Sequence, residues 1–129
     1  LPTRGSIDVL VVDDNADVLQ LYERYLAGSR YRFRGIQDPK LGLDTAIEMQ
    51  PGVVLLDVMM PQRDGWTLLS QLREHPKTQS IPIVVCSILS QEQFALTLGA
   101  ADFIRKPVTR QTFLQVLDRQ LALQPKESD

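Results

Sequence analysis

Short apolar runs and amphipathic helical segments alternate along this sequence, and this alternation constrains the fold most strongly. Most of the apolar runs are rich in β-branched residues, which is typical of strands buried in a parallel sheet. We predict strands at 7–12, 31–36, 53–56, 83–86 and 102–104. Helices are predicted at 17–27, 38–50, 66–73 and 90–98, with a last helix after Thr109. The predicted caps are Asp38, Ser90 and Thr109, and the predicted helix stops are Gly28 and Gly99. This order predicts an α/β fold, in which helices cover both faces of an open, mostly parallel five-stranded sheet.

Polar side chains follow most of the predicted strands, at the point where each strand ends. They are Asp13, Asp14, Asp57, Ser87 and Lys106. In an open parallel sheet the carboxyl ends of the strands meet at one edge, and ligands bind there near the point where the strand order reverses. We therefore expect these residues to converge on one pocket, although they lie far apart in the sequence.

The chemistry of these side chains suggests a phosphoryl site. Carboxylates about 4 Å apart repel each other by on the order of 4 kcal/mol per pair in a protein-like dielectric. A cation must therefore offset this repulsion. Mg²⁺ suits an all-oxygen ligand set, and Lys106 supplies a second, mobile positive charge. An Asp nucleophile, a metal ion, a lysine and the Ser87 hydroxyl are the parts needed to form and hold an aspartyl phosphate.

Composition argues against several other functions. The chain of 129 residues holds one Cys and one His, which cannot build a tetrahedral zinc site. A net charge of −2 without a Lys/Arg-rich run does not favour direct nucleic-acid binding. The longest apolar stretch, 53–60, is interrupted by Asp57 and is too short to span a membrane. We expect a single soluble, cytoplasmic domain that binds neither nucleic acid nor membrane.

Four segments around the predicted site are shared with a known family. They are VLVVDDN at 9–15, LLDVMMPQRDGW at 55–66, VVCS at 84–87 and LGAADFIRKP at 98–107. In these segments the chain resembles the receiver domains of two-component response regulators. The resemblance covers nearly the whole chain and implies the flavodoxin-like (CheY-like) doubly wound fold, with three α/β/α layers. We divide the chain into a leader at 1–6, a receiver domain at 7–123 and a linker at 124–129.

The resemblance implies a phosphoacceptor and a metal site. Asp57 would accept a phosphoryl group from the phosphohistidine of a histidine kinase or of a histidine phosphotransfer protein. Asp14, Asp57 and the backbone carbonyl of Met59 would bind Mg²⁺ directly, and Asp13 would act largely through a water molecule. The resemblance thus adds the Met59 carbonyl to the carboxylates found by the strand pattern.

The resemblance also implies a switch. Ser87 would donate a hydrogen bond to the phosphoryl group, Lys106 would pair with it, and Phe103 would be the aromatic residue that turns inward as Ser87 moves. The peptide bond before Pro107 is expected to be cis, which costs little before proline. The output would come from a partner protein or an output domain outside this chain.

The sequence departs from the family pattern in the region of the fourth helix. Lys106 follows Ser87 by 19 positions, about one helical turn fewer than in stand-alone receivers, so we expect a short or displaced fourth helix. Shorter versions resemble receivers attached to hybrid sensor kinases, and the dimerisation mode is left open. Ile88 stands where the family usually has a small residue, and its bulk is expected to narrow the access to Asp57.

Two other functions compete with a signalling switch. A Mg²⁺-dependent phosphohydrolase that forms an aspartyl phosphate usually needs an acid two positions after the nucleophile, and Met59 stands there. A flavodoxin-like cofactor-binding protein needs a phosphate-binding loop after the first strand, where this chain has Asp13 and Asp14. We therefore predict a signalling domain rather than an enzyme, and keep the phosphohydrolase as the alternative.

Overall fold

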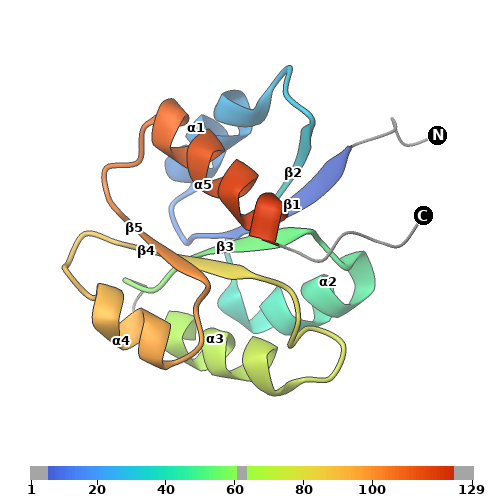
Figure 1. Cartoon of the computed structure of the whole chain (residues 1–129), viewed down its shortest axis with the longest axis vertical. Coiled ribbons are helices and arrows are strands. Elements are labelled where there is room, and N and C mark those ends of the chain that lie inside the picture. Colours follow the sequence, from blue (N-terminus) through green and yellow to red (C-terminus); the bar gives the residue numbers. More distant parts are fainter. Residues whose placement is uncertain (1–5, 61–63, 124–129) are drawn as a thin grey trace.

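A computed structural model describes residues 6–60 and 64–123 as a parallel sheet with helices on both faces (Figure 1). The spatial order of the strands is β2-β1-β3-β4-β5, and every neighbouring pair is parallel. The strands are β1 (Ile7–Val12), β2 (Tyr31–Ile36), β3 (Val53–Asp57), β4 (Ile83–Ser87) and β5 (Asp102–Arg105). The strand order reverses between β1 and β3, so their carboxyl ends border the position where such sheets bind ligands. The predicted sheet is confirmed; apart from Ser6, the predicted leader (1–6) and linker (124–129) lie outside the described residues.

Helices form the two outer layers. They are α1 (Ala16–Leu26), the 3₁₀ helix η1 (Pro39–Leu41), α2 (Gly42–Met49), α3 (Asp64–Glu74), α4 (Glu92–Thr97) and α5 (Arg110–Leu123). Helices α1 and α5 cover one face of the sheet, and α2, α3 and α4 cover the other (Figure 1). In the described part of the chain, none of these helices is long and apolar enough to cross a membrane.

Two hydrophobic cores form because alternate side chains of a strand point to opposite faces of the sheet. On β1, Val9 and Val11 pack with side chains of α1 and α5. Leu10 and Val12 pack with side chains of α2, α3 and α4. All four are shielded from solvent, which confirms that the continuous apolar run is a strand buried on both faces. The polar residues that follow the central strands are therefore attached to strands that are packed on both faces.

Several helix ends agree with the sequence prediction. Gly28 after α1 and Gly99 after α4 have φ angles of 79° and 106°, the left-handed conformation that commonly ends a helix. Thr109 caps α5, since its Oγ1 accepts a hydrogen bond from a backbone N–H in the next turn at 3.1 Å. Helix α1 begins one residue earlier than predicted, because the Asn15 side chain accepts two backbone N–H groups at 2.9 and 3.2 Å and caps it.

Helices α2 and α4 begin later than predicted, and α3 begins two residues earlier, at Asp64. Asp38 caps its helix as expected, but the next residues form the 3₁₀ turn η1, and α2 begins only at Gly42. Helix α4 has six residues and is short, as the spacing predicted. The predicted cap of α4 at Ser90 is wrong, because the Ser90 hydroxyl accepts a hydrogen bond from the Arg105 guanidinium at 2.8 Å instead.

Candidate functional site

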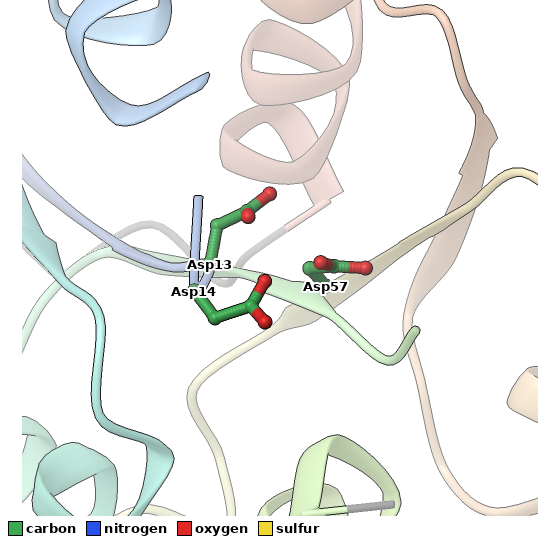
Figure 2. Close-up of side chains that lie close together, drawn as sticks. All are labelled: Asp13, Asp14 and Asp57. Atoms are coloured by element: carbon green, nitrogen blue, oxygen red, sulfur yellow. The ribbon is translucent and has the colours of Figure 1, made fainter. Parts of the chain in front are cut away.

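Three carboxylates lie together at the carboxyl ends of β1 and β3. Asp13 and Asp14 follow β1 directly, and Asp57 is the last residue of β3 (Figure 2). One oxygen from each carboxylate lies within 4.8 Å of the other two. Asp13 and Asp57 are 1% and 5% exposed, whereas Asp14 faces solvent. The structure thus brings the three predicted carboxylates to one place and leaves one side of the group open.

Lys106 reaches both buried carboxylates from the end of β5. Its Nζ donates a hydrogen bond to Oδ2 of Asp13 at 2.9 Å and lies 3.6 Å from Oδ2 of Asp57. Its backbone N–H donates to the carbonyl of Ser87 at 2.8 Å, which ties Lys106 to β4. The peptide bond between Lys106 and Pro107 is cis, as the resemblance implied. One lysine therefore offsets part of the charge of two buried carboxylates.

Backbone N–H groups hold the other oxygens of these two carboxylates. Oδ1 of Asp57 accepts from the N–H of Met59 at 2.9 Å, and Oδ1 of Asp13 accepts from the N–H of Asn15 at 2.9 Å. These bonds fix both side chains in orientation. They leave Oδ2 of each carboxylate directed toward the cation Lys106.

Burial sets the electrostatics of the site. Burial raises the pKa of Asp57, and the nearby charges of Asp13 and Asp14 raise it further, against the lowering effects of the Met59 N–H and Lys106. Burial acts to lower the pKa of Lys106, but the hydrogen bond and charge of Asp13 outweigh it, so this pKa is raised. Lys106 therefore stays cationic at neutral pH, and the carboxylate cluster favours additional positive charge.

Ser87, the predicted hydroxyl donor, is fully buried at the end of β4. Its hydroxyl donates a hydrogen bond to Oε1 of Gln91 at 2.9 Å and accepts one from the N–H of Leu89 at 3.1 Å. The strand register places it next to Cys86, which pairs with Asp57 across β3 and β4. Ser87 thus lies at the same sheet edge as the carboxylates, with its hydroxyl bonded to its own loop.

Two neighbours of the site behave as hydrophobic residues. Phe103, the predicted switch aromatic, lies on β5 opposite Val85 and is partly buried against the core formed with α2, α3 and α4. Cys86 is 1% exposed, and burial raises the pKa of its thiol well above the usual value. Cys86 therefore packs in the strand and does not supply a thiolate.

A cavity of about 790 Å³ lies beside the loops that follow β3 and β4. It is lined by side chains from both loops and from α3 and α4, among them Met59, Leu89, Gln91, Trp66 and Phe94. The rings of Trp66 and Phe94 meet edge to face, with their centroids 4.7 Å apart. Ile88, expected to narrow the access to Asp57, is 56% exposed and lines a different cavity together with Lys106.

The sequence prediction missed two residues of this region. Gln91 bonds the hydroxyl of Ser87, and Arg105 bonds the carbonyl of Ile88 at 3.3 Å and the hydroxyl of Ser90 at 2.8 Å. No spacing rule marks either residue, because both contacts depend on the path of the loop between β4 and α4. In the sequence, Gln91 is only one position of a predicted helix, and Arg105 only follows a predicted strand.

Comparison with known proteins identifies the family. The family model of the response regulator receiver domain matches residues 9–118. The response regulator PleD of Caulobacter vibrioides (strain NA1000 / CB15N) is 36% identical over 106 residues, which cover 80% of this chain and 23% of PleD. The chain thus spans less than a third of the length of this curated relative.

Solved structures agree with this assignment. The signal receiver domain of a signal transduction histidine kinase from Syntrophus aciditrophicus matches with a TM-score of 0.82 at 25% identity, over 96% of this chain and 97% of that chain. The receiver domain of sensor histidine kinase PA1611 from Pseudomonas aeruginosa PAO1, solved with a magnesium ion in its active site cleft, matches with a TM-score of 0.81 at 22% identity, over 91% and 98%. The predicted CheY-like, doubly wound fold is confirmed. This chain belongs to the response regulator receiver domain family and is a receiver domain of a two-component system.

Proposed function

We propose that Asp57 is the phosphoacceptor of this receiver domain and takes its phosphoryl group from a phosphohistidine of a histidine kinase or a histidine phosphotransfer protein. The observation that carries the proposal is the placement of Lys106 between two buried carboxylates. Asp57 presents Oδ2 toward this cation, while its Oδ1 is held by the Met59 N–H. Asp13 is bonded more closely to Lys106, and Asp14 has no comparable cation contact among the described residues.

The transfer step needs positioning and charge neutralisation more than covalent assistance. An oxygen of Asp57 forms a bond to phosphorus while the bond from phosphorus to the imidazole nitrogen breaks. The electron pair of that bond leaves with the imidazole nitrogen, which takes up a proton from solvent and restores the neutral ring. Lys106 stabilises the phosphoryl oxygens, and the fixed orientation of the Asp57 side chain lowers the entropic cost of the attack.

We also propose a Mg²⁺ site formed by Asp14, Asp57 and the carbonyl of Met59, with Asp13 acting through a water molecule. Mg²⁺ prefers oxygen ligands and keeps several waters, which suits a carboxylate group with one exposed member. Three carboxylate oxygens within 4.8 Å of one another support the site, as does the raised pKa of Asp57, since a cation relieves the same repulsion. When bound, Mg²⁺ would neutralise the charge that the phosphoryl group brings.

The substitution Asp14→Asn should weaken Mg²⁺ binding by about tenfold or more. Removing one unit charge about 4 Å from a divalent cation costs about 2 kcal/mol even in a water-like dielectric. Isothermal titration calorimetry with MgCl₂ measures the effect, and Asp17→Asn, an exposed acid in the first turn of α1 outside the cluster, is the matched control. Equal affinities in wild type and Asp14→Asn would remove Asp14 from the ligand set.

One experiment separates the receiver from the phosphohydrolase alternative. Acetyl phosphate with Mg²⁺ should add one phosphoryl group to the wild-type chain, observed by intact-protein mass spectrometry, and EDTA should prevent the addition. A generic ester such as p-nitrophenyl phosphate should not be turned over repeatedly, because Met59 occupies the position where such enzymes need a general acid. Sustained turnover of the ester would favour the phosphohydrolase.

The double substitution Met59→Asn with Leu89→Glu should speed the loss of phosphate from Asp57 by about tenfold, equal to about 1.4 kcal/mol in the barrier. Both side chains line the 790 Å³ cavity, and each stands two positions after a residue of the site, Asp57 or Ser87. Their apolar surface would exclude a hydrolytic water from the line of attack on the phosphorus. The decay of the phosphorylated mass after removal of acetyl phosphate measures the rate. Leu96→Glu is the control, because Leu96 is likewise an exposed apolar residue but lies on α4, outside this cavity. An unchanged lifetime would refute the steric explanation.

We propose that the signal leaves through a shift between two arrangements of the surface around Ser87 and Phe103. Support comes from Phe103, which lies on the edge strand β5 and is only partly buried, so a turn of its side chain would change the exposed surface. The recipient would be a partner protein or an output domain joined to the receiver unit at 7–123. A parent related to hybrid sensor kinases fits the short α4.

A further inference from the structure

We propose that Gln91 is a positioning residue of this switch, which competes with the phosphoryl group for the single hydroxyl proton of Ser87. This inference rests on the proposed function of Asp57 and Ser87 and adds a residue to it. Gln91 precedes α4 and is the residue whose side chain receives the Ser87 hydrogen bond.

The hydrogen-bond pattern of Ser87 makes the competition unavoidable. A serine hydroxyl has one proton to donate and two lone pairs that accept. The N–H of Leu89 supplies the accepted bond at 3.1 Å, and the proton is donated to Oε1 of Gln91 at 2.9 Å. Phosphoryl oxygens carry no proton at the relevant site and only accept. Ser87 therefore has to release Gln91 before it can bond a phosphoryl group on Asp57.

Hydrogen bonds from the neighbouring strand β5 hold the loop that contains Gln91. The Arg105 side chain on β5 donates to the carbonyl of Ile88 at 3.3 Å and to the hydroxyl of Ser90 at 2.8 Å. The N–H of Gln91 donates to the carbonyl of Leu89 at 3.0 Å. These bonds fix the backbone of the loop, so the bond from Ser87 to Gln91 breaks most easily by rotation of the Gln91 side chain.

Space for that rotation exists. The Gln91 side chain lines the cavity of about 790 Å³ and is only partly buried, whereas Ser87 is fully buried. Gln91 can thus exchange its bond to Ser87 for bonds to water. A hydrogen bond to a charged phosphoryl oxygen is stronger than one to a neutral amide, so the exchange goes forward after phosphorylation. Breaking the bond between Ser87 and Gln91 therefore reduces the free energy gained when Ser87 bonds the phosphoryl group.

The test is a titration of the full chain with beryllofluoride, a mimic of the phosphoryl group, in the presence of Mg²⁺. Gln91→Leu keeps most of the side-chain volume and removes the acceptor, and Gln91→Ala is a second variant in case the first disturbs the fold. Both should tighten binding by roughly three- to tenfold, the ratio expected when one neutral hydrogen bond no longer competes. Gln93→Leu, on an exposed position of α4, is the matched control and should leave the affinity unchanged.

A double-mutant cycle separates this role from a structural one. With Ser87→Ala in the background, Gln91→Leu should no longer change the affinity, because no hydroxyl proton remains to compete for. An equal tightening in that background, or no tightening in the single variant, would overturn the inference while leaving Asp57 as the phosphoacceptor. Failure of the wild-type chain to bind beryllofluoride at all would instead overturn the proposed function.

Discussion

The substitution Asp57→Ala should abolish phosphorylation of this chain by acetyl phosphate and Mg²⁺. The structure offers no equivalent oxygen among the described carboxylates at this sheet edge. Both oxygens of Asp13 are engaged, one by the Asn15 N–H and one by Lys106 at 2.9 Å. Asp14 is exposed, and among the described residues it has no ion pair with Lys106 or another cationic side chain, so no lysine would stabilise a phosphoryl group there.

Unfolding is not expected to explain the loss. Burial raises the pKa of Asp57, which means that the folded chain destabilises the charged form of this side chain. Its removal also relieves the repulsion from Asp13, so the Asp57→Ala variant should be about as stable as wild type or more stable. Asp17→Ala is the control for removing an exposed acid near the site. Labelling that survives in Asp57→Ala would exclude Asp57 as the nucleophile.

The substitution Phe113→Ala should lower the free energy of unfolding by about 3–5 kcal/mol, the range for truncating a buried aromatic residue. Phe113 lies on α5 and is fully buried. Its ring packs against those of Tyr22 and Tyr25 on α1, with centroids 5.1 and 6.1 Å apart. The truncation would leave a cavity between these two helices and the sheet, because β1 is packed on both faces and cannot shift to fill it.

Urea denaturation measured by circular dichroism gives this free energy. Phe94→Ala is the matched control, since Phe94 is 51% exposed and loses less packing; we expect a change below about 1 kcal/mol. A loss of similar size in both variants would contradict the assignment of Phe113 to the core. The comparison also tests the packing of α1 and α5 on the sheet that carries the site.

The sequence predicted the strands well because their signal is local. The apolar runs before Asp57 and before Ser87 give strand bounds that differ from the structure by only one residue, at the carboxyl end. Parallel strands end at one edge of the sheet, so the strand pattern alone is enough to group Asp13, Asp57 and Lys106. Periodicity contains no information on strand order, which the structure supplies.

Contacts that depend on a loop path could not be predicted. Serine is a common helix cap, but the hydroxyl of Ser90 accepts a hydrogen bond from Arg105 on β5 instead. Gln91 is an ordinary polar residue in the sequence, and only the fold turns its side chain toward Ser87. For Ser90 a hydrogen bond from a distant strand replaced the local cap, whereas the bond between Ser87 and Gln91 lies within one loop whose path periodicity does not predict.

Chemical trapping of the phosphorylated wild-type chain tests the central claim most directly. Borohydride reduces an aspartyl phosphate to homoserine, and peptide mass spectrometry after phosphorylation with acetyl phosphate and Mg²⁺ locates the reduced residue. We predict reduction at Asp57, and at neither Asp13 nor Asp14. Reduction at one of those two residues, or no reduction in a chain that has gained a phosphoryl group, would contradict the assignment of Asp57 as the phosphoacceptor.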